Sequence, residues 1–235
     1  MPWSPNTWKT RYVLNYKGLK YKTEWVEYPD IAGVCQKLGA PPTEKKPDGQ
    51  PHYTLPMIYD PTTKKAVVDS WDIARYLDDA YPDTPRVFPA GTVALQAAFH
   101  DFVWGTLGEP VFMNVIARTC ASLPPRSEEY FRATREAAFG AKLEALATEA
   151  RWVQTEAAFG TLKGYLEKNG EGKEMLIAGE PGKITYSDIQ VAAILVWARI
   201  VHGVDSAEWK RLASMHEGKW GRFLEQFSKY EAADT

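Results

Sequence analysis

Strand-like sequence occurs only in the first third of this chain, and this restriction limits the possible folds more than any other feature. The runs YTLPMIYD (53–60) and KKAVVD (64–69) are short and rich in apolar, aromatic and β-branched residues, and the turn residues between them indicate a hairpin. After the proline-rich stretch DTPRVFPAG (83–91), only helical periodicity remains. We therefore expect an α/β domain over residues 1–84 and an all-helical domain over residues 92–235.

The first domain is expected to mix helices and strands. A helix is predicted over residues 6–17, because a glycine follows it and glycine tolerates the left-handed conformation that ends helices. The run YKTEWVEY (21–28) alternates and is rich in aromatic residues, which predicts a strand. A short helix after Asp30 leads into a loop crowded with Pro, Gly and Lys, and a further helix covers residues 71–81.

The second domain is expected to contain only helices. Pro110 should kink or restart the first of them, because proline lacks the N–H that a helix interior requires. A helix beginning near Ser127 is predicted to run towards Leu166, with a bend near Gly140. The remaining predicted helices cover residues 184–200 and lie around Leu212 and Phe223.

Charge and composition argue against several classes of function. The 235 residues carry a formal net charge of -2, whereas a nucleic-acid-binding surface needs an excess of basic residues. The two cysteines and four scattered histidines form no metal-ligand pattern, so we expect no metal cofactor. No apolar run is long enough to cross a membrane, and the N-terminus has no apolar signal segment. These features indicate a cytoplasmic protein with reduced cysteines.

Pro56 lies inside an apolar strand-like run, where a proline removes a hydrogen bond of the sheet. One explanation is an edge strand. The other is a cis peptide between Leu55 and Pro56 that turns the backbone groups of Leu55 away from the sheet. Those groups could then pair with a peptide-like ligand, as an added strand does. The sequence leaves both explanations open.

Asp69 and Ser70 stand directly before the helix at residues 71–81. One interpretation is that Ser70 caps this helix. The same helix start also offers free N–H groups and the positive end of the helix dipole, which suit a ligand carboxylate, while Asp69 could bind a ligand ammonium. Together the two residues would bind the head group of an α-amino acid.

Ser4 lies just before the first helix, whose start we expect near Asn6 or Thr7, with Thr7 as a possible cap. A hydroxyl and several unpaired amides at a helix start would stabilise a ligand thiolate. Asn6 or Thr7 could share or replace the role of Ser4, because all three lie at the same helix start. Lowering the pKa of a thiol by one unit requires about 1.4 kcal/mol, a feasible demand on these groups.

Thr185 and Asp188 begin the helix at residues 184–200 with the spacing of a capping box, in which Asp replaces the commoner Glu. We interpret this pair as an element of folding in the helical core. It is not expected to be catalytic.

The order of these motifs resembles that of the cytosolic glutathione transferases: an α/β domain with Leu-Pro and then Asp-Ser, followed by an all-helical domain with a T-x-x-D cap. The resemblance covers nearly the whole chain. It implies a thioredoxin-like N-terminal domain that binds glutathione, an all-helical C-terminal domain that supplies a hydrophobic substrate pocket, and a homodimer. The segments that look most like the fungal-specific class A transferases, relatives of the bacterial lignin β-etherases, are WSPNTWKTRYVLNYKGLKY (3–21), GAPPTE (39–44), HYTLP (52–56) and DSWDIARYLD (69–78).

Applied residue by residue, the resemblance makes Ser4 the catalytic residue, at a position where related classes have cysteine or serine. Leu55, beside a cis Pro56, would pair its backbone with the cysteinyl unit of glutathione. Asp69 and Ser70 would hold the γ-glutamyl head. A lysine is expected to reach the glycine carboxylate, and the sequence does not choose between Lys37, Lys45 and Lys46, with His52 as a weaker candidate.

The chain differs from the family pattern at one point, although Thr185 and Asp188 match its capping element. The family begins with a strand before the Ser4 loop, whereas only residues 1–3 precede Ser4 here. Either upstream residues are absent from this form of the chain, or the sheet lacks that strand and the glutathione site is poorly formed. The serine itself favours conjugation over reduction of mixed disulfides, which requires a cysteine nucleophile.

The second substrate is expected to bind between the two domains, and the aromatic content of 13% suits either a large core or a cleft for flat apolar ligands. The leading hypothesis is a glutathione transferase that acts on small aromatic electrophiles or cleaves aryl ethers by thiolate attack. The alternatives are a non-catalytic carrier of aromatic molecules and a regulatory protein with a transferase fold. Candidate lining residues, for which core packing is an equally good explanation, are Trp8, Phe112, Met113 and Arg118.

Overall fold

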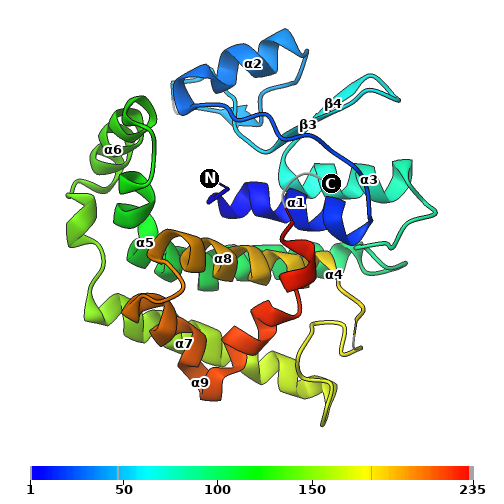
Figure 1. Cartoon of the computed structure of the whole chain (residues 1–235), viewed down its shortest axis with the longest axis vertical. Helices are drawn as coiled ribbons and strands as arrows, with labels where there is room; N and C mark the ends of the chain where they lie inside the picture. The colour runs from blue at the N-terminus through cyan, green and yellow to red at the C-terminus, as the bar shows by residue number, and fades with distance from the viewer. Residues whose placement is uncertain (1, 47, 181, 233–235) are drawn as a thin grey trace.

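The computed structural model describes residues 2–46, 48–180 and 182–232, and Figure 1 shows a small part with helices and strands next to a larger part made of helices. The α-helices are α1 (Pro5–Tyr16), α2 (Ile31–Lys37), α3 (Ser70–Ala80), α4 (Val93–Phe102), α5 (Glu109–Ala121), α6 (Pro125–Phe139), α7 (Glu149–Leu166), α8 (Tyr186–His202) and α9 (Ala207–Glu225). The strands are β1 (Glu44–Lys45), β2 (Pro51–His52), β3 (Met57–Asp60) and β4 (Lys65–Val68). Short 3-10 turns cover Tyr28–Asp30, Leu143–Ala145, Glu167–Asn169 and Ser228–Tyr230.

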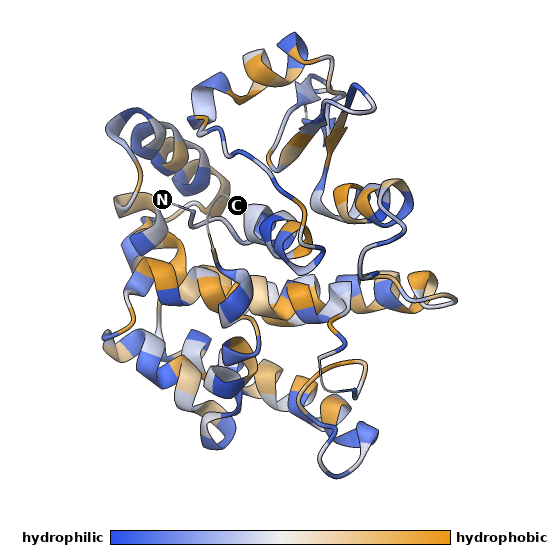
Figure 2. Cartoon of the chain, turned by 45° about the vertical axis from the view of Figure 1, so that its right-hand side comes forward, coloured by the Kyte–Doolittle hydropathy of each residue, from blue (hydrophilic) through white to orange (hydrophobic). Residues whose placement is uncertain are grey.

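The strands form two antiparallel pairs. β3 pairs with β4, with Met57 opposite Val68 and Asp60 opposite Lys65, which confirms the predicted hairpin. The apolar residues of these two strands are orange in Figure 2. β1 pairs with β2 inside the loop that we expected to contain only Pro-, Gly- and Lys-rich irregular chain. Strands of two residues show no alternating pattern, so the sequence analysis missed them.

The prediction of a strand over residues 21–28 is wrong. A strand requires a neighbour that pairs with its backbone N–H and C=O groups, and the described residues that precede α1 form no strand. Side chains hold the segment instead. Val26 and Tyr28 pack in an apolar cluster with residues of α2 and β4. Arg11 of α1 donates hydrogen bonds to the hydroxyls of Tyr21 at 2.9 Å and Thr23 at 3.0 Å.

The core is centred on α8, in which every residue from Tyr186 to Ala198 is buried. α1 packs against α8 and also against α3, so that it lies between the strands and the helical part (Figure 1). A single apolar cluster joins Trp8 of α1, Ile73 of α3 and Ile189 of α8. The N-terminal α/β part and the helical part therefore share one core, and α1 is packed within it.

Two helix boundaries in the second part differ from the predictions. Gly140 has a left-handed φ of 64° and ends α6, so the long helix expected to bend there is two separate helices. α6 also begins earlier than expected, with Pro125 in its first turn, because the fixed φ of proline suits a helix start. Ser127 is consequently inside the helix and does not cap it. Its buried hydroxyl donates to the Glu27 carboxylate at 3.0 Å.

The remaining helical predictions are confirmed. Pro110 restarts the chain as α5, directly after the π-helical segment Val103–Gly108. α9 has non-helical backbone at residues 215–218, which divides it into the two helices expected around Leu212 and Phe223. The capping box of α8 is present, with the Asp188 carboxylate accepting from Thr185 N at 2.8 Å. The complete burial of Asp188 raises its pKa to about 6.

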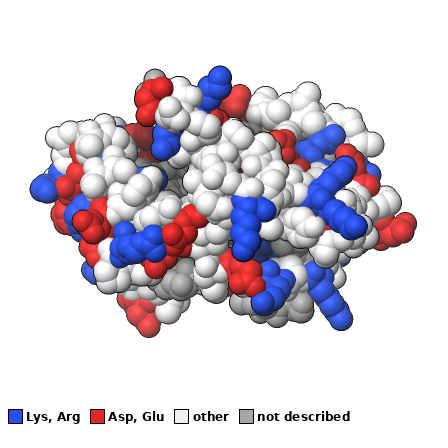
Figure 3. All heavy atoms as spheres, turned by 90° about the horizontal axis from the view of Figure 1, so that it is seen from above, with Lys and Arg blue, Asp and Glu red and all other residues white. Residues whose placement is uncertain are grey.

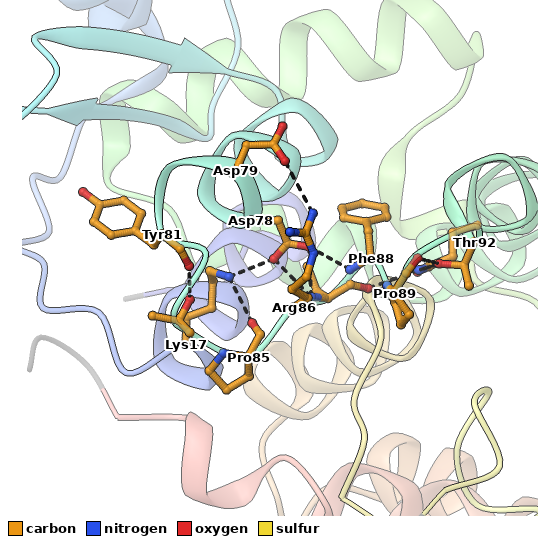
Figure 4. Close-up of polar contacts among 12 residues, drawn as sticks. Lys17, Asp78, Asp79, Tyr81, Pro85, Arg86, Phe88, Pro89 and Thr92 are labelled. Atoms are coloured by element: carbon orange, nitrogen blue, oxygen red, sulfur yellow. Dashed lines mark hydrogen bonds and ion pairs between the residues drawn. The ribbon is translucent and has the colours of Figure 1, made fainter.

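A buried ion pair connects α1, α3 and the segment that follows α3 (Figure 4). Lys17 Nζ lies 2.8 Å from Asp78 Oδ1, and both side chains are fully buried. Lys17 also donates to the backbone carbonyl of Pro85 at 3.0 Å. Asp78 accepts from the backbone N–H groups of Val87 at 3.1 Å and Phe88 at 2.8 Å. This cluster attaches the chain that leads into the helical part to the end of α1.

Candidate functional site

The start of α1 presents the hydroxyl of Ser4. Ser4 is the N-cap residue, and Pro5 begins the helix, so the start lies before Asn6 and Thr7 and the expectation that Thr7 caps it is wrong. Thr7 Oγ1 instead donates to the carbonyl of Ser4 at 2.9 Å. Ser4 Oγ makes no hydrogen bond with another described residue. Among the hydroxyls at this helix start, the one on Ser4 is therefore available to a ligand.

The start of α3 is capped by Asp69, whose φ is 68°. Its Oδ1 accepts from Trp71 N at 2.8 Å and Asp72 N at 3.4 Å. The prediction that Ser70 is the cap is wrong, because its buried hydroxyl turns into the core and accepts from Tyr186 Oη at 3.2 Å. Within the described chain, Asp69 Oδ2 has no hydrogen-bond donor. This oxygen could accept from a ligand ammonium.

The segment before β3 has a cis peptide between Leu55 and Pro56, which confirms the second of the two explanations for this proline. The backbone N–H and C=O of Leu55 make no hydrogen bond with any residue that the structure describes. Both groups are therefore free for the kind of pairing that an extended peptide forms with a strand.

The other residues predicted to bind glutathione form no hydrogen bond or ion pair with these groups in the described chain. Lys37 is exposed at the end of α2, and Lys45 and Lys46 are exposed in and just after β1. His52 lies in β2, where its Nδ1 is 2.8 Å from the carboxylate of Glu44. No contact in the described chain brings any of these four side chains to Ser4, Leu55 or Asp69.

Two of the predicted substrate-lining residues belong to the core. Trp8 and Met113 are 3% and 8% exposed, and the indole N–H of Trp8 donates to the Pro2 carbonyl at 2.7 Å. Core packing therefore explains both. Phe112 is partly buried beside Trp197, with ring centroids 5.8 Å apart, and Arg118 is exposed on α5.

Lys9 is a charged residue near this site that the sequence analysis missed. It is only 7% exposed and lies one helical turn after Pro5, with its Nζ 5.5 Å from the centre of the Trp104 ring. Burial lowers the pKa of Lys9 to about 8, an effect that the charge of Asp69 partly opposes. The only feature of the sequence that could have pointed to Lys9 is its position within the first two turns of α1. Its burial depends on helices far away in the sequence.

Neither cysteine can serve as the nucleophile of this site. Cys35 and Cys120 are both free and completely buried, and burial raises the pKa of each thiol. A reactive cysteine is instead exposed and has a lowered pKa.

The surface gives two further observations. On the face shown in Figure 3, Lys and Arg side chains are interspersed with Asp and Glu, without a continuous area of one sign. In the part of the chain that the structure describes, no helix combines the length and apolar character needed to span a bilayer.

Comparisons with known proteins match both parts of the chain. The model "Glutathione S-transferase, N-terminal domain" matches residues 3–80, and "Glutathione S-transferase, C-terminal domain" matches residues 94–230. Among solved structures, the glutathione transferase GSTFuA2 from Phanerochaete chrysosporium is 61% identical, with a TM-score of 0.97 over 99% of this chain and 93% of that chain. GSTFuA3 from the same fungus is 54% identical, with a TM-score of 0.97 over 100% of this chain and 93% of that chain.

A third similar structure is a glutathione S-transferase of Ceriporiopsis subvermispora, solved in complex with glutathione. It is 47% identical, with a TM-score of 0.94 over 99% of this chain and 94% of that chain. These matches show the expected fold, a thioredoxin-like N-terminal domain with a small sheet followed by a helical C-terminal domain. The chain therefore belongs to the glutathione transferase family and is similar to fungal members of that family.

Proposed function

We propose that the protein is a serine-type glutathione transferase in which Ser4 donates a hydrogen bond to the thiolate of bound glutathione. The observation that carries this proposal is the hydroxyl of Ser4, which has no hydrogen-bond partner in the described chain and lies at the N-terminus of α1. The unpaired N–H groups and the dipole of that helix favour a negative charge at this position. The Ceriporiopsis relative, solved with glutathione, supports the choice of thiol.

The remaining groups would hold the tripeptide around this sulfur. The free backbone N–H and C=O of Leu55 would pair with the cysteinyl unit, and Asp69 Oδ2 would accept from the γ-glutamyl ammonium. The lysine that reaches the glycine carboxylate would come from Lys37, Lys45 or Lys46, or His52 would take its place. Ser70 would hold the γ-glutamyl head together with Asp69, and its hydroxyl also accepts from Tyr186 Oη in the core.

The proposed reaction is attack of the thiolate on a small aromatic electrophile. The sulfur lone pair forms a carbon–sulfur bond, and the leaving group, a halide or an aryloxide, departs with the electrons of the broken bond. The protein positions the two substrates and keeps the sulfur ionised, and no covalent intermediate with the protein is needed. Flat hydrophobic ligands would bind in the same pocket between the domains, close to Phe112 and Arg118.

We also propose the domain division at residues 84–92 and a homodimer, as expected from the family resemblance. Exposed apolar side chains support an association surface: Leu95 of α4 is 72% exposed and Tyr165 of α7 is 53% exposed. Tyr165 contacts Phe102 at the end of α4, with ring centroids 5.2 Å apart. Light scattering on the purified protein will measure the mass directly.

Retention on immobilised glutathione, followed by release with free glutathione, is the first expected result. The retained protein should also convert a chlorinated nitroaromatic compound to its glutathione adduct, because an ionised thiol displaces chloride from an activated ring. Retention without any turnover would favour the non-catalytic carrier. Lack of retention would contradict the proposed function.

Reduction of glutathionyl mixed disulfides should be weak or absent in the natural protein. This reaction needs a thiolate that attacks the disulfide, and Ser4 provides only a hydroxyl while both cysteines are buried. Ser4→Cys should gain the activity, since the helix start lowers the pKa of a thiol placed there. The assay is reduction of a small glutathionyl disulfide, with Thr7→Cys as the matched control. Equal activity in the natural protein and in Ser4→Cys would show that the sulfur does not lie beside residue 4.

A further inference from the structure

Polar side chains connect helix α6 to the 3-10 turn before α2, in the strand-containing part of the chain. Arg126 donates two hydrogen bonds to the Asp30 carboxylate, at 2.9 and 2.8 Å. The Ser127 hydroxyl donates to Glu27 Oε2 at 3.0 Å and accepts from the backbone N–H of Tyr28 at 3.2 Å. The four side chains of these contacts, from Glu27, Asp30, Arg126 and Ser127, form what we call the α6 clasp.

Aromatic rings extend this contact to the residue before Ser4. Tyr28 stacks on Tyr130 of α6, with ring centroids 5.8 Å apart, and lies 5.6 Å from the ring of Phe131. Trp3 directly precedes Ser4 in the sequence. Its ring centroid is 6.3 Å from that of Tyr28 and 6.3 Å from that of Phe131. The contact between α6 and the turn therefore covers one side of the segment that leads into α1.

The far end of α6 lies beside the proposed substrate pocket. Phe139 is the last residue of α6 and is 37% exposed, and its ring centroid is 6.0 Å from that of Phe112. Apart from the turn before α2, the main contacts of α6 are with α5 and the turn Leu143–Ala145. In Figure 1, α6 extends away from the helical core toward the part that contains α2. This helix therefore runs along the side of the site that lies between Trp3 and Phe112.

The attachment of α6 is suited to opening. Pro125 begins the helix and Gly140, with a φ of 64°, ends it, so the chain turns at both ends. The side chains of Arg126 and Asp30 are 57% and 49% exposed, and an exposed ion pair contributes little stability and is weakened by salt. A basic residue in the first turn also opposes the helix dipole. The stability of α6 therefore does not explain Arg126, whereas its contact with Asp30 does.

We propose that the α6 clasp limits the size of the second substrate. With the clasp closed, α6 restricts the space beside Ser4 to a small aromatic electrophile, and with the clasp open a bulkier electrophile enters. This inference rests on the proposed function. The residues of the clasp act through the position of α6 and touch no reacting atom, so they are positioning residues.

The test compares two electrophiles that react at the same kind of ring. One is chlorodinitrobenzene, which releases chloride, and the other is the dinitrophenyl ether of a hydroxycoumarin, which releases a bulky fluorescent aryloxide. In both reactions the glutathione sulfur forms a bond to the ring carbon, and the leaving group departs with the electrons of the broken bond. The measured quantity is kcat/KM for the ether divided by kcat/KM for the chloride. Because the intrinsic reactivities of the two compounds are the same for every variant, a change in this ratio reports on the pocket.

Arg126→Ala should raise the ratio about 2- to 5-fold, the factor expected from the loss of one exposed ion pair, and should leave kcat/KM for the chloride within about 2-fold of the natural value. Asp30→Ala removes the same pair from the other side and should give the same result, so the test does not depend on one variant. Asp30→Arg combined with Arg126→Asp restores a pair with exchanged charges and should return the ratio to its natural value. A general loss of stability would not be reversed by this exchange.

Arg132→Ala is the matched control. Arg132 is on the same helix, and its ion pairs are with Glu128, Glu136 and Glu144 of the helical part, so the ratio should stay at its natural value. An unchanged ratio in both single variants of the clasp, an equal rise in Arg132→Ala, or no return of the ratio on charge exchange would overturn the clasp and leave the proposed function standing. Absence of glutathione conjugation to either electrophile in the natural protein would overturn the proposed function, and the clasp with it.

Discussion

Replacing Asp78 with alanine should lower the free energy of unfolding by about 3–5 kcal/mol, the largest loss of stability that we expect from a single substitution in this chain. The carboxylate of Asp78 is fully buried and accepts from Lys17 and from the backbone N–H groups of Val87 and Phe88. Its removal leaves a buried positive charge and two buried N–H groups without partners. The remaining contact of Lys17 is the Pro85 carbonyl, which cannot neutralise the charge.

Urea unfolding followed by fluorescence measures this loss, and Asp79→Ala is the matched control. Asp79 is the next residue of α3, but its side chain is 65% exposed and its closest cation, Arg86, is 3.5 Å away. The control should change the free energy of unfolding by no more than about 0.5 kcal/mol. Equal stability of the two variants would show that the Lys17–Asp78 pair does not hold α1, α3 and the following segment together.

The sequence predicts the elements that local pattern determines. Most helices follow from apolar periodicity and from caps such as Thr185 with Asp188, and the β3–β4 hairpin follows from two short apolar runs around turn residues. The expected strand at residues 21–28 fails because a strand depends on a neighbouring strand, which local sequence cannot provide. The two-residue strands β1 and β2 are too short to leave a pattern.

The positions of the candidate site are predictable only in part. The order of the motifs predicts Ser4, Leu55 and Asp69 as site residues. In the described chain, the Ser4 hydroxyl at the start of α1, the Leu55 backbone groups before β3 and Asp69 Oδ2 at the start of α3 have no hydrogen-bond partner. The cis form of the peptide before Pro56 could not be chosen from sequence, because the energy difference between the isomers at proline is only about 0.5–1 kcal/mol and tertiary contacts decide it. Lys9 was missed because α8 and the π-helical segment, nearly 100 residues and more along the chain, bury it.

Ser4→Ala should reduce kcat/KM for a chlorinated nitroaromatic substrate by about 10²-fold, the size of effect found when one hydrogen bond to a reacting anion is removed. The affinity for S-methylglutathione should stay nearly constant, because that ligand has no thiolate to accept the bond. The expected loss of kcat/KM therefore reflects weaker ionisation and stabilisation of the glutathione sulfur, and not weaker binding of the tripeptide. Unchanged turnover in Ser4→Ala would assign the role to another group of the helix start, such as the backbone N–H groups or Asn6.

Thr10→Val is the matched control for this substitution. Thr10 is on the same helix, and its buried hydroxyl has no hydrogen-bond partner in the described chain, so its loss removes no contact. The control should retain turnover within about 2-fold, since valine has nearly the same shape as threonine.

Ultraviolet titration of enzyme-bound glutathione follows the appearance of the thiolate as the pH rises, and it tests directly whether α1 and its cap ionise the sulfur. A free thiol has a pKa of about 8.5, and the bound thiol should titrate at least about one unit lower in the natural protein and return towards the free value in Ser4→Ala. A bound thiol that titrates like the free tripeptide, or a lowered value that is identical in both proteins, would contradict the role given to the Ser4 hydroxyl.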